Sequence, residues 1–213
     1  LTEDELADLI SDFDVIIAGT EKITQKVMDK GINLKFISRV GIGLDSVDLL
    51  AAECRGIKVS YTPDAPGPAV VDLTMGLMYT LLRKVHQANI QLHKGNWNRH
   101  LGKRLTDCTI GIIGVGRVGS KVIKNLQVLG CKNILYYDKK VRLNETSNAN
   151  IKLADKEDIY QNSDIVSLHL PLDLETKNMV TIEEIKLMKK NSFLINAARG
   201  GIINEIDLDK ALN

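Results

Sequence analysis

Three glycines lie where an apolar run meets a helical pattern, in the stretch "TIGIIGVGRVGSKVIKNLQVLG" at residues 109–130. Gly114, Gly116 and Gly119 have the spacing G-x-G-x-x-G. Between a strand and a helix, such glycines allow a tight turn, a close approach of the backbone to a pyrophosphate, and close packing of helix against strand. The helix N-terminus adds free N–H groups and a positive dipole. The stretch predicts the phosphate-binding loop of a dinucleotide site, with a plain strand–helix turn as the alternative.

An acidic residue follows at the spacing that this kind of site needs. Asp138 ends the next predicted strand, 19 residues after Gly119 (138 − 119). At this place an acid hydrogen-bonds the ribose hydroxyls of NAD. Its negative charge repels the 2′-phosphate of NADP, although the neighbouring Lys139 and Lys140 could weaken that repulsion. The pattern therefore favours NAD.

Arg199 is the candidate for binding an anionic substrate. Its guanidinium is permanently charged and presents a planar fork of donors that matches a carboxylate. It follows a predicted strand, at the carboxyl end where ligands bind in open α/β sheets, and Gly200 and Gly201 leave room beside it. The alternative is a surface arginine in a salt bridge.

Alternating strands and helices must position these residues. The apolar, β-branched runs that predict strands are residues 14–19, 34–41, 57–63, 109–114, 133–138, 164–170 and 191–198, with a short possible strand at 151–154 in a polar connection. The patterns that predict helices are residues 21–31, 46–56, 67–95 as one long helix, 117–129, 156–161, 181–189 and 205–212. This alternation predicts an α/β fold with parallel sheets. We expect two domains, residues 1–66 and the larger 67–213.

The composition excludes several classes of protein. Hydrophobic residues make up 44% and charged residues 26%, which is ordinary for a globular protein. A formal net charge of +1 gives no reason to expect nucleic acid or an anionic membrane as partner. The cysteines, Cys54, Cys108 and Cys131, fit neither a disulfide framework nor a metal site. We expect them to be small buried hydrophobes in a cytoplasmic protein that binds no metal.

Together these stretches resemble the D-isomer-specific 2-hydroxyacid dehydrogenase family, which includes phosphoglycerate dehydrogenase. The resemblance rests on the glycine loop with Asp138, and on "SRVGIGLDSVDL" (38–49), "SLHLPLDLETKNMV" (167–180) and "FLINAARGGIINEIDLDKAL" (193–212). It implies a Rossmann-type NAD-binding domain at residues 67–213 and a smaller flavodoxin-like substrate domain at residues 1–66. It also implies hydride transfer between a nicotinamide and a D-2-hydroxy acid, 3-phosphoglycerate or a related acid.

The resemblance implies roles for individual residues. The backbone at Val40 and Gly41 would hold the substrate carboxylate, and Arg39 matches an arginine of the phosphoglycerate pocket. Arg199 would be catalytic, binding the carboxylate and polarising the carbonyl. The expected cofactor-binding positions are Gly114, Gly116, Arg117, Val118, Gly119, Asp138, Leu170, Thr176, Ala197, Ala198 and Arg199. A homodimer is implied too, with the segment at 93–105 wrapping a partner through Trp97; alternatively, Trp97 caps the preceding helix within its own chain.

Two features depart from the family pattern. Ala18 stands where phosphoglycerate dehydrogenases carry a second phosphate-binding arginine, which puts that substrate in doubt. The chain ends 14 residues after Arg199 (213 − 199), before the family's catalytic glutamate and histidine. We therefore expect a truncated piece of a longer enzyme, inactive by itself. His86, His93, His100 and His169 are expected to be solvent-facing or structural rather than substitutes.

Two other classes of protein remain open. One is a non-catalytic NAD-binding scaffold like the transcriptional corepressors that share the family's fold; turnover would exclude it. The other is a different Rossmann enzyme, similar to adenosylhomocysteine hydrolase. That enzyme would use catalytic residues in another domain and has no use for "NAARGG" at residues 196–201.

Overall fold

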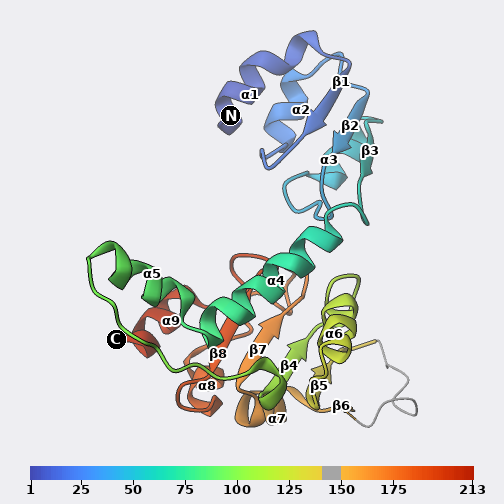
Figure 1. Cartoon of the computed structure of the whole chain (residues 1–213). Coiled ribbons are helices and arrows are strands. Elements are labelled where there is room, and N and C mark those ends of the chain that lie inside the picture. The colour runs from blue at the N-terminus through green and yellow to red at the C-terminus, as the bar shows by residue number, and fades with distance from the viewer. Residues whose placement is uncertain (141–149) are drawn as a thin grey trace. The chain divides into compact units, whose positions relative to one another are not determined.

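The structure, a computed structural model, describes residues 1–140 and 150–213. Most of the polar connection predicted before residue 151 lies outside the described residues. The chain divides into two compact units, unit 1 (Leu1–Gly67) and unit 2 (Pro68–Asn213). Figure 1 traces both units.

Unit 1 is built on a parallel sheet. Its described strands form the order β1-β2-β3 and are β1 (Val15–Ala18), β2 (Phe36–Arg39) and β3 (Lys58–Tyr61). Its helices are α1 (Glu3–Leu9), η1 (Ile10–Asp12), α2 (Gln25–Lys30) and α3 (Leu49–Cys54). Ile23, Val27 and Ile37 are fully buried in its core. Because the strands are parallel, the loops that follow Ala18 and Arg39 emerge at the same edge.

Unit 2 is built on a larger parallel sheet. Its described strands form the order β6-β5-β4-β7-β8 and are β4 (Thr109–Ile113), β5 (Asn133–Tyr137), β6 (Ile151–Leu153), β7 (Ile165–Leu168) and β8 (Phe193–Asn196). The chain moves from β4 outward to β6 and returns to β7 on the other side. The crevice between β4 and β7 is thus the point where the strand order reverses, and ligands bind at such points in Rossmann sheets. The predicted α/β fold is confirmed.

Helices connect and flank these strands (Figure 1). They are α4 (Gly67–Leu82), α5 (Val85–His93), η2 (Leu105–Asp107), α6 (Gly119–Val128), α7 (Lys156–Asn162), α8 (Ile182–Leu187) and α9 (Glu205–Leu212). Ile110 and Ile112 on β4 belong to one hydrophobic core with Val122 and Leu126 of α6. This packing fixes the start of α6 directly after β4.

The prediction of one long helix at residues 67–95 is wrong. The helix breaks after Leu82, and Lys84 has a left-handed backbone with φ 54°. The chain returns to this point: Lys103 N–H donates to the Leu82 carbonyl at 3.1 Å, and a Cβ on Gly102 would clash with the same carbonyl. The stripe of Val71, Met75, Met78 and Leu82 on α4 is buried in the core of unit 2, whereas α5 buries no side chain. The helix therefore breaks at the point beyond which its side chains are no longer buried.

The cysteines differ from one another. Cys108 and Cys131 are buried as expected, and burial raises the pKa of both thiols. Cys54 is exposed, so the expectation that it is buried is wrong; it is the last residue of α3, on the side away from the core. None forms a disulfide in the described structure. No helix among residues 1–140 and 150–213 combines the length and apolarity needed to span a membrane.

Candidate functional site

Two of the three loop glycines are required by packing. Gly114 follows β4 with φ 94°, a conformation that side-chain-bearing residues rarely adopt, and its N–H donates to the Tyr137 carbonyl at 2.8 Å. A Cβ on Gly114 would clash with the His169 carbonyl oxygen. A Cβ on Gly119, where α6 begins, would clash with the Gly114 carbonyl oxygen. The turn therefore excludes side chains at both positions.

Gly116 is different, because the fold does not require it. No described atom lies within 4 Å of the position that its Cβ would take, and its φ is not in the left-handed region. Gly116 and Arg117 are exposed, and Val118 is half-buried. Open space beside a bare backbone in front of a helix N-terminus suits a phosphate group.

Asp138 is held against the glycine loop. One carboxylate oxygen, Oδ2, accepts a hydrogen bond from Val115 N–H, and Oδ1 accepts one from Lys140 N–H, both at 2.8 Å. These bonds fix the carboxylate beside the loop. Since the loop and the acid come from the ends of neighbouring strands, they form one continuous surface.

A pocket of about 530 Å³ opens beside Asp138. It lies between the carboxyl end of β5 and the segment that follows β7, and an ion pair between Lys139 and Glu175 connects these two sides. The residues that line it are Ile113, Tyr137, Asp138, Lys139, Lys140, Lys156, Leu170, Pro171, Asp173, Glu175, Thr176 and Met179. The pocket thus brings together Asp138, Leu170 and Thr176, which the sequence assigned separately to a cofactor.

The Thr176 hydroxyl is engaged within its own loop. It accepts a hydrogen bond from Asp173 N–H at 2.8 Å and donates to the Pro171 carbonyl at 2.7 Å. The backbone N–H and hydroxyl of Thr176 also bind the Asp173 carboxylate, and with the Glu175 N–H they hold its pKa below the usual range. Thr176 shapes the pocket wall, and a direct hydroxyl contact with a cofactor stays a prediction.

Arg199 lies in a loop that Asn196 organises. Asn196 Oδ1 accepts from the N–H groups of Ala198 at 3.1 Å and Arg199 at 3.4 Å, while its Nδ2 donates to the Arg199 carbonyl at 2.7 Å. Arg199 Nη1 donates to the Ala198 carbonyl at 2.8 Å. Ala197 lies in the same loop. Sequence reasoning gave Asn196 no role; its place in the N-x-A-R-G-G motif was the available signal.

His169 is structural. Its Nε2 lies 3.0 Å from Ser167 Oγ, and burial lowers its pKa to about 4, so the ring is neutral at pH 7. The backbone N–H of His169 donates to the Ile113 carbonyl at 2.8 Å. The residue therefore positions backbone behind the glycine loop and is not solvent-facing.

The three residues expected to bind substrate are neighbours in unit 1. Val40 N–H donates to the Ala18 carbonyl at 2.9 Å, and Gly41 N–H donates to Thr62 Oγ1 at 2.8 Å. The Arg39 guanidinium folds over Gly41, where a Cβ would clash with it. Gly41 has φ 146°, a backbone conformation that favours glycine, whereas the flexible Arg39 side chain could move away from a Cβ. A substrate carboxylate at Gly41 would share that N–H with Thr62, which sequence reasoning missed.

A parallel sheet of this order, with a glycine loop after its central first strand and an acid after the second, defines a dinucleotide-binding protein of the Rossmann class. Residues 75–213 match the family model described as D-isomer specific 2-hydroxyacid dehydrogenase, NAD binding domain. The chain belongs to this family, and residues 75–213 are its NAD-binding domain. The predictions of the family and of NAD as cofactor are confirmed.

Known proteins resemble the chain over most of its length. It is 39% identical to D-3-phosphoglycerate dehydrogenase of Methanocaldococcus jannaschii, covering 100% of this chain and 41% of the relative. It is 37% identical to hydroxypyruvate reductase of Thermotoga maritima, covering 96% of this chain and 67% of the relative. D-lactate dehydrogenase of Aquifex aeolicus, solved with NAD and lactic acid, has a TM-score of 0.86 at 28% identity, covering 97% of this chain and 62% of that one. The chain thus spans two fifths to two thirds of these relatives.

Proposed function

We propose that the protein is an oxidoreductase that transfers a hydride between the nicotinamide of NAD and C2 of a D-2-hydroxy acid. The observation that carries this proposal is the Arg199 loop, which hydrogen bonds of Asn196 hold in place. This loop lies in the same unit as the glycine loop and Asp138. The guanidinium would bind the substrate carboxylate and polarise the C2 carbonyl as negative charge develops on its oxygen. NAD, when bound, accepts or donates the hydride. Consumption of NADH by the full-length protein with glyoxylate, hydroxypyruvate and pyruvate tests the proposal.

Unit 1 is proposed to bind the substrate. In this assignment residues 1–66 are the substrate domain and residues 67–213 the NAD-binding domain. The backbone at Val40 and Gly41 holds the substrate carboxylate, with Arg39 beside it. The geometry that supports the assignment is the position of this loop at the carboxyl edge of its sheet, where ligands of parallel sheets bind. A cytoplasmic location stays a prediction.

Asp138 is expected to select NAD. We expect Asp138→Ser to weaken NAD binding by roughly 1.5–3 kcal/mol, about 10- to 140-fold, because a charged acceptor for the ribose is lost. The preference should move toward NADP, since the carboxylate no longer repels a 2′-phosphate. Calorimetric titration of both dinucleotides measures this. Glu157→Gln, which removes an exposed carboxylate outside the pocket, is the matched control. An unchanged ratio of the two affinities in Asp138→Ser would contradict the assignment.

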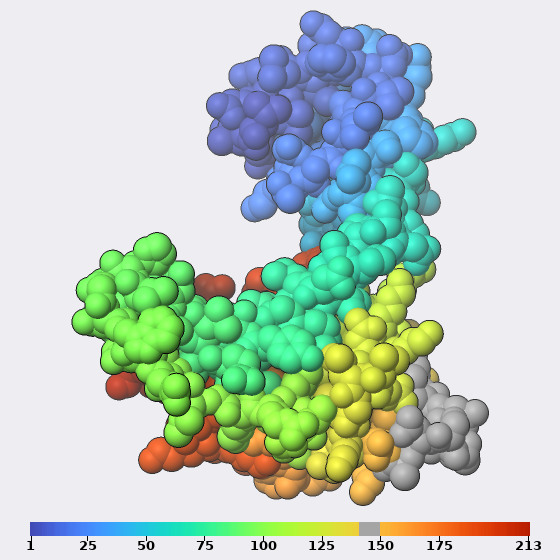
Figure 2. Space-filling view, in the orientation of Figure 1, coloured from blue at the N-terminus to red at the C-terminus, as the bar shows by residue number. Residues whose placement is uncertain are grey.

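We propose that the protein is a homodimer related by a two-fold axis. The segment from α5 to Leu101 supports this, because Trp97 and Leu101 are each 85% exposed within the chain. Figure 2 shows this part of the chain, in green, projecting at one side of unit 2. This exposure gives no support to the alternative that Trp97 caps the preceding helix within its own chain. Tryptophan is enriched at the centres of interfaces, where truncation is most damaging.

Removal of Trp97 should weaken the dimer. Trp97→Ala is expected to raise the dissociation constant by about 30-fold or more, the effect of losing roughly 2 kcal/mol at an interface centre. Light scattering across a concentration series measures it. Leu174→Ala removes an apolar side chain that is 97% exposed elsewhere in unit 2 and should leave the dimer intact. A protein that is monomeric at tens of micromolar would refute the dimer, and a fully dimeric Trp97→Ala would remove Trp97 from the interface.

A further inference from the structure

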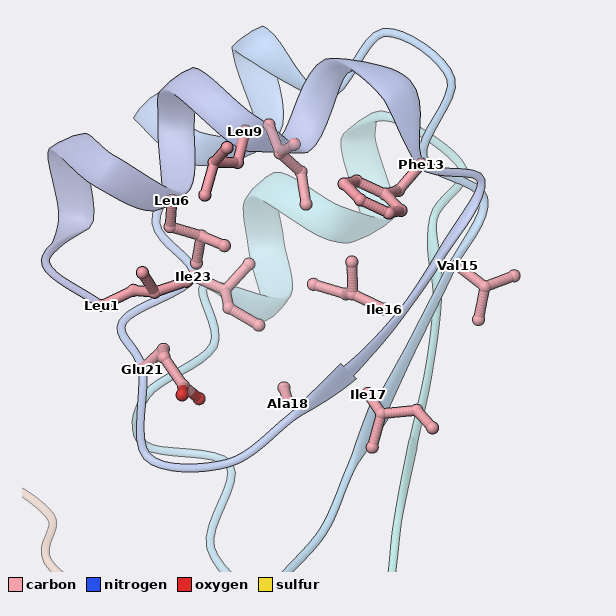
Figure 3. Close-up of a pocket in the computed structure, with 11 residues that line it drawn as sticks. Leu1, Leu6, Leu9, Phe13, Val15, Ile16, Ile17, Ala18, Glu21 and Ile23 are labelled. Atoms are coloured by element: carbon pink, nitrogen blue, oxygen red, sulfur yellow. The ribbon is translucent and has the colours of Figure 1, made fainter.

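Two opposite charges lie at the carboxyl edge of the sheet in unit 1. Ala18 and Arg39 are paired in the register of β1 and β2, so the residues that follow both strands emerge side by side. Glu21 lies in the loop after β1, and its Oε2 accepts the N–H of Gly19 at 2.8 Å. Figure 3 shows the Glu21 side chain directed from this loop toward the strand end that carries Ala18. The hydrogen bond fixes the carboxylate near the end of β1, the strand that pairs with β2.

The positive partner is Arg39. Its Nη1 donates to the Val40 carbonyl, which folds the guanidinium over Gly41, and its buried Nε has no acceptor among the residues that the structure describes. The pKa of Glu21 is lowered mainly by its own N–H and by that of Gly19, and to a smaller extent by the charges of the N-terminal amino group and of Arg39. Glu21 is therefore ionised at neutral pH, and its negative charge is close enough to interact with the charge of Arg39.

We propose that Glu21 determines substrate specificity: beside Arg39 it disfavours a phosphate group on the substrate and selects 2-keto acids whose C3 substituent is uncharged. This inference rests on the proposed function, in which the loop from Arg39 to Gly41 holds the substrate. A phosphate carries a charge of roughly −1.5 to −2 at pH 7, so a fixed carboxylate at this edge repels it. Ala18 offers no second cation to compensate. Specificity of this kind arises from a repulsive element as much as from attraction.

A pair of substrates that differ only in the phosphate tests the proposal. The quantity measured is the ratio of kcat/KM for 3-phosphohydroxypyruvate to kcat/KM for hydroxypyruvate. We expect the unaltered protein to favour hydroxypyruvate. Glu21→Gln, whose amide oxygen still accepts the Gly19 N–H, should raise the ratio by on the order of tenfold by removing one like charge. The gain should shrink at high salt, because salt screens exposed charges.

Two controls separate this effect from others. Glu53→Gln removes an exposed carboxylate from the last turn of α3, which runs away from the carboxyl edge, and should leave the ratio unchanged. Glu21→Asp keeps the charge and should keep the preference for hydroxypyruvate. A ratio that is unaltered in Glu21→Gln, or that rises equally in Glu53→Gln, would overturn the proposal.

A binding measurement separates the proposal from the proposed function. If no 2-keto acid is turned over, the oxidoreductase assignment fails. Calorimetric titration of 3-phosphoglycerate and of D-glycerate, with NAD present, still tests Glu21. If Glu21→Gln binds 3-phosphoglycerate more tightly than the unaltered protein does, while its affinity for D-glycerate is unchanged, the proposal that Glu21 disfavours phosphate is supported without turnover. If the unaltered protein and Glu21→Gln bind 3-phosphoglycerate with the same affinity, the proposed role of Glu21 is refuted.

Discussion

Arg199→Lys should lower kcat/KM for the 2-keto acid by roughly 2–4 kcal/mol of transition-state stabilisation, about 30- to 1,000-fold. A lysine ammonium is a point charge and cannot replace a planar fork that binds carboxylate and carbonyl oxygen together. The backbone of the loop should keep its shape, because Asn196 binds the backbone of residues 198 and 199 and not the guanidinium. NAD affinity should therefore change far less than turnover. Steady-state kinetics and calorimetric titration of NAD measure the two quantities.

The control for this substitution is Arg104→Lys. Arg104 is an exposed arginine that forms a surface ion pair with Asp107, at 4.0 Å, and the same chemical change there should leave kcat/KM unaltered. Near-normal turnover by Arg199→Lys would mean that Arg199 is merely structural. A loss of NAD affinity as large as the loss of turnover would indicate that Arg199 binds the cofactor rather than the substrate.

The loop glycines should respond in opposite ways to substitution. Gly119→Ala places a Cβ against the Gly114 carbonyl, a backbone atom that cannot rotate away, so the fold should lose roughly 1–3 kcal/mol or more. Gly116→Val places its side chain in open space, so the melting temperature should stay near normal while NAD binding weakens strongly. Thermal unfolding and calorimetric titration of both variants give this comparison.

Gly76→Ala is the matched control for these variants. Gly76 lies within α4, no described atom is within 4 Å of its Cβ position, and alanine there should be neutral or slightly stabilising. Unchanged NAD affinity in Gly116→Val would remove the glycine loop from the cofactor site. A fall in its melting temperature as large as that of Gly119→Ala would show that Gly116 also serves the fold.

The positions of the strands were predictable because they depend on a local pattern, a short apolar run rich in β-branched residues. The run at residues 109–114 is apolar and β-branched and is bounded by glycine, and β4 occupies residues 109–113 as the central strand. The short possible strand at residues 151–154, in a polar connection, is found as β6 at Ile151–Leu153. Alternation of such runs with helices then gave parallel sheets, since parallel strands need a crossover connection.

The features that sequence reasoning missed depend on residues far apart in the chain. The break between α4 and α5 is stabilised by Lys103, about twenty residues beyond the break, and neither glycine nor proline marks Arg83 and Lys84. The engagement of Gly41 by Thr62 depends on how the loop after β2 meets the end of β3. The pairing of Ala18 with Arg39, which brings the loop that carries Glu21 to the same edge as Arg39, follows from the register of β1 with β2, which composition does not encode.

The site was predicted in part, by motif. Asp138 and the glycine loop are held together by a hydrogen bond from Val115, as expected for residues at neighbouring strand ends. The engagement of the Thr176 hydroxyl by Pro171 and Asp173 could not be foreseen, because it depends on the fold of one irregular segment. Motif spacing identifies which strand ends meet, whereas hydrogen bonds within loops require coordinates.

The measurement that tests the central claim most directly is NADH formation from NAD with the two enantiomers of glycerate and of lactate, by the protein in its full length and by its Arg199→Lys variant. The account predicts that a D-enantiomer is oxidised while its L-enantiomer is not, and that Arg199→Lys loses this activity. Binding of NAD without oxidation of any D-2-hydroxy acid would contradict the account and would favour a non-catalytic NAD-binding scaffold.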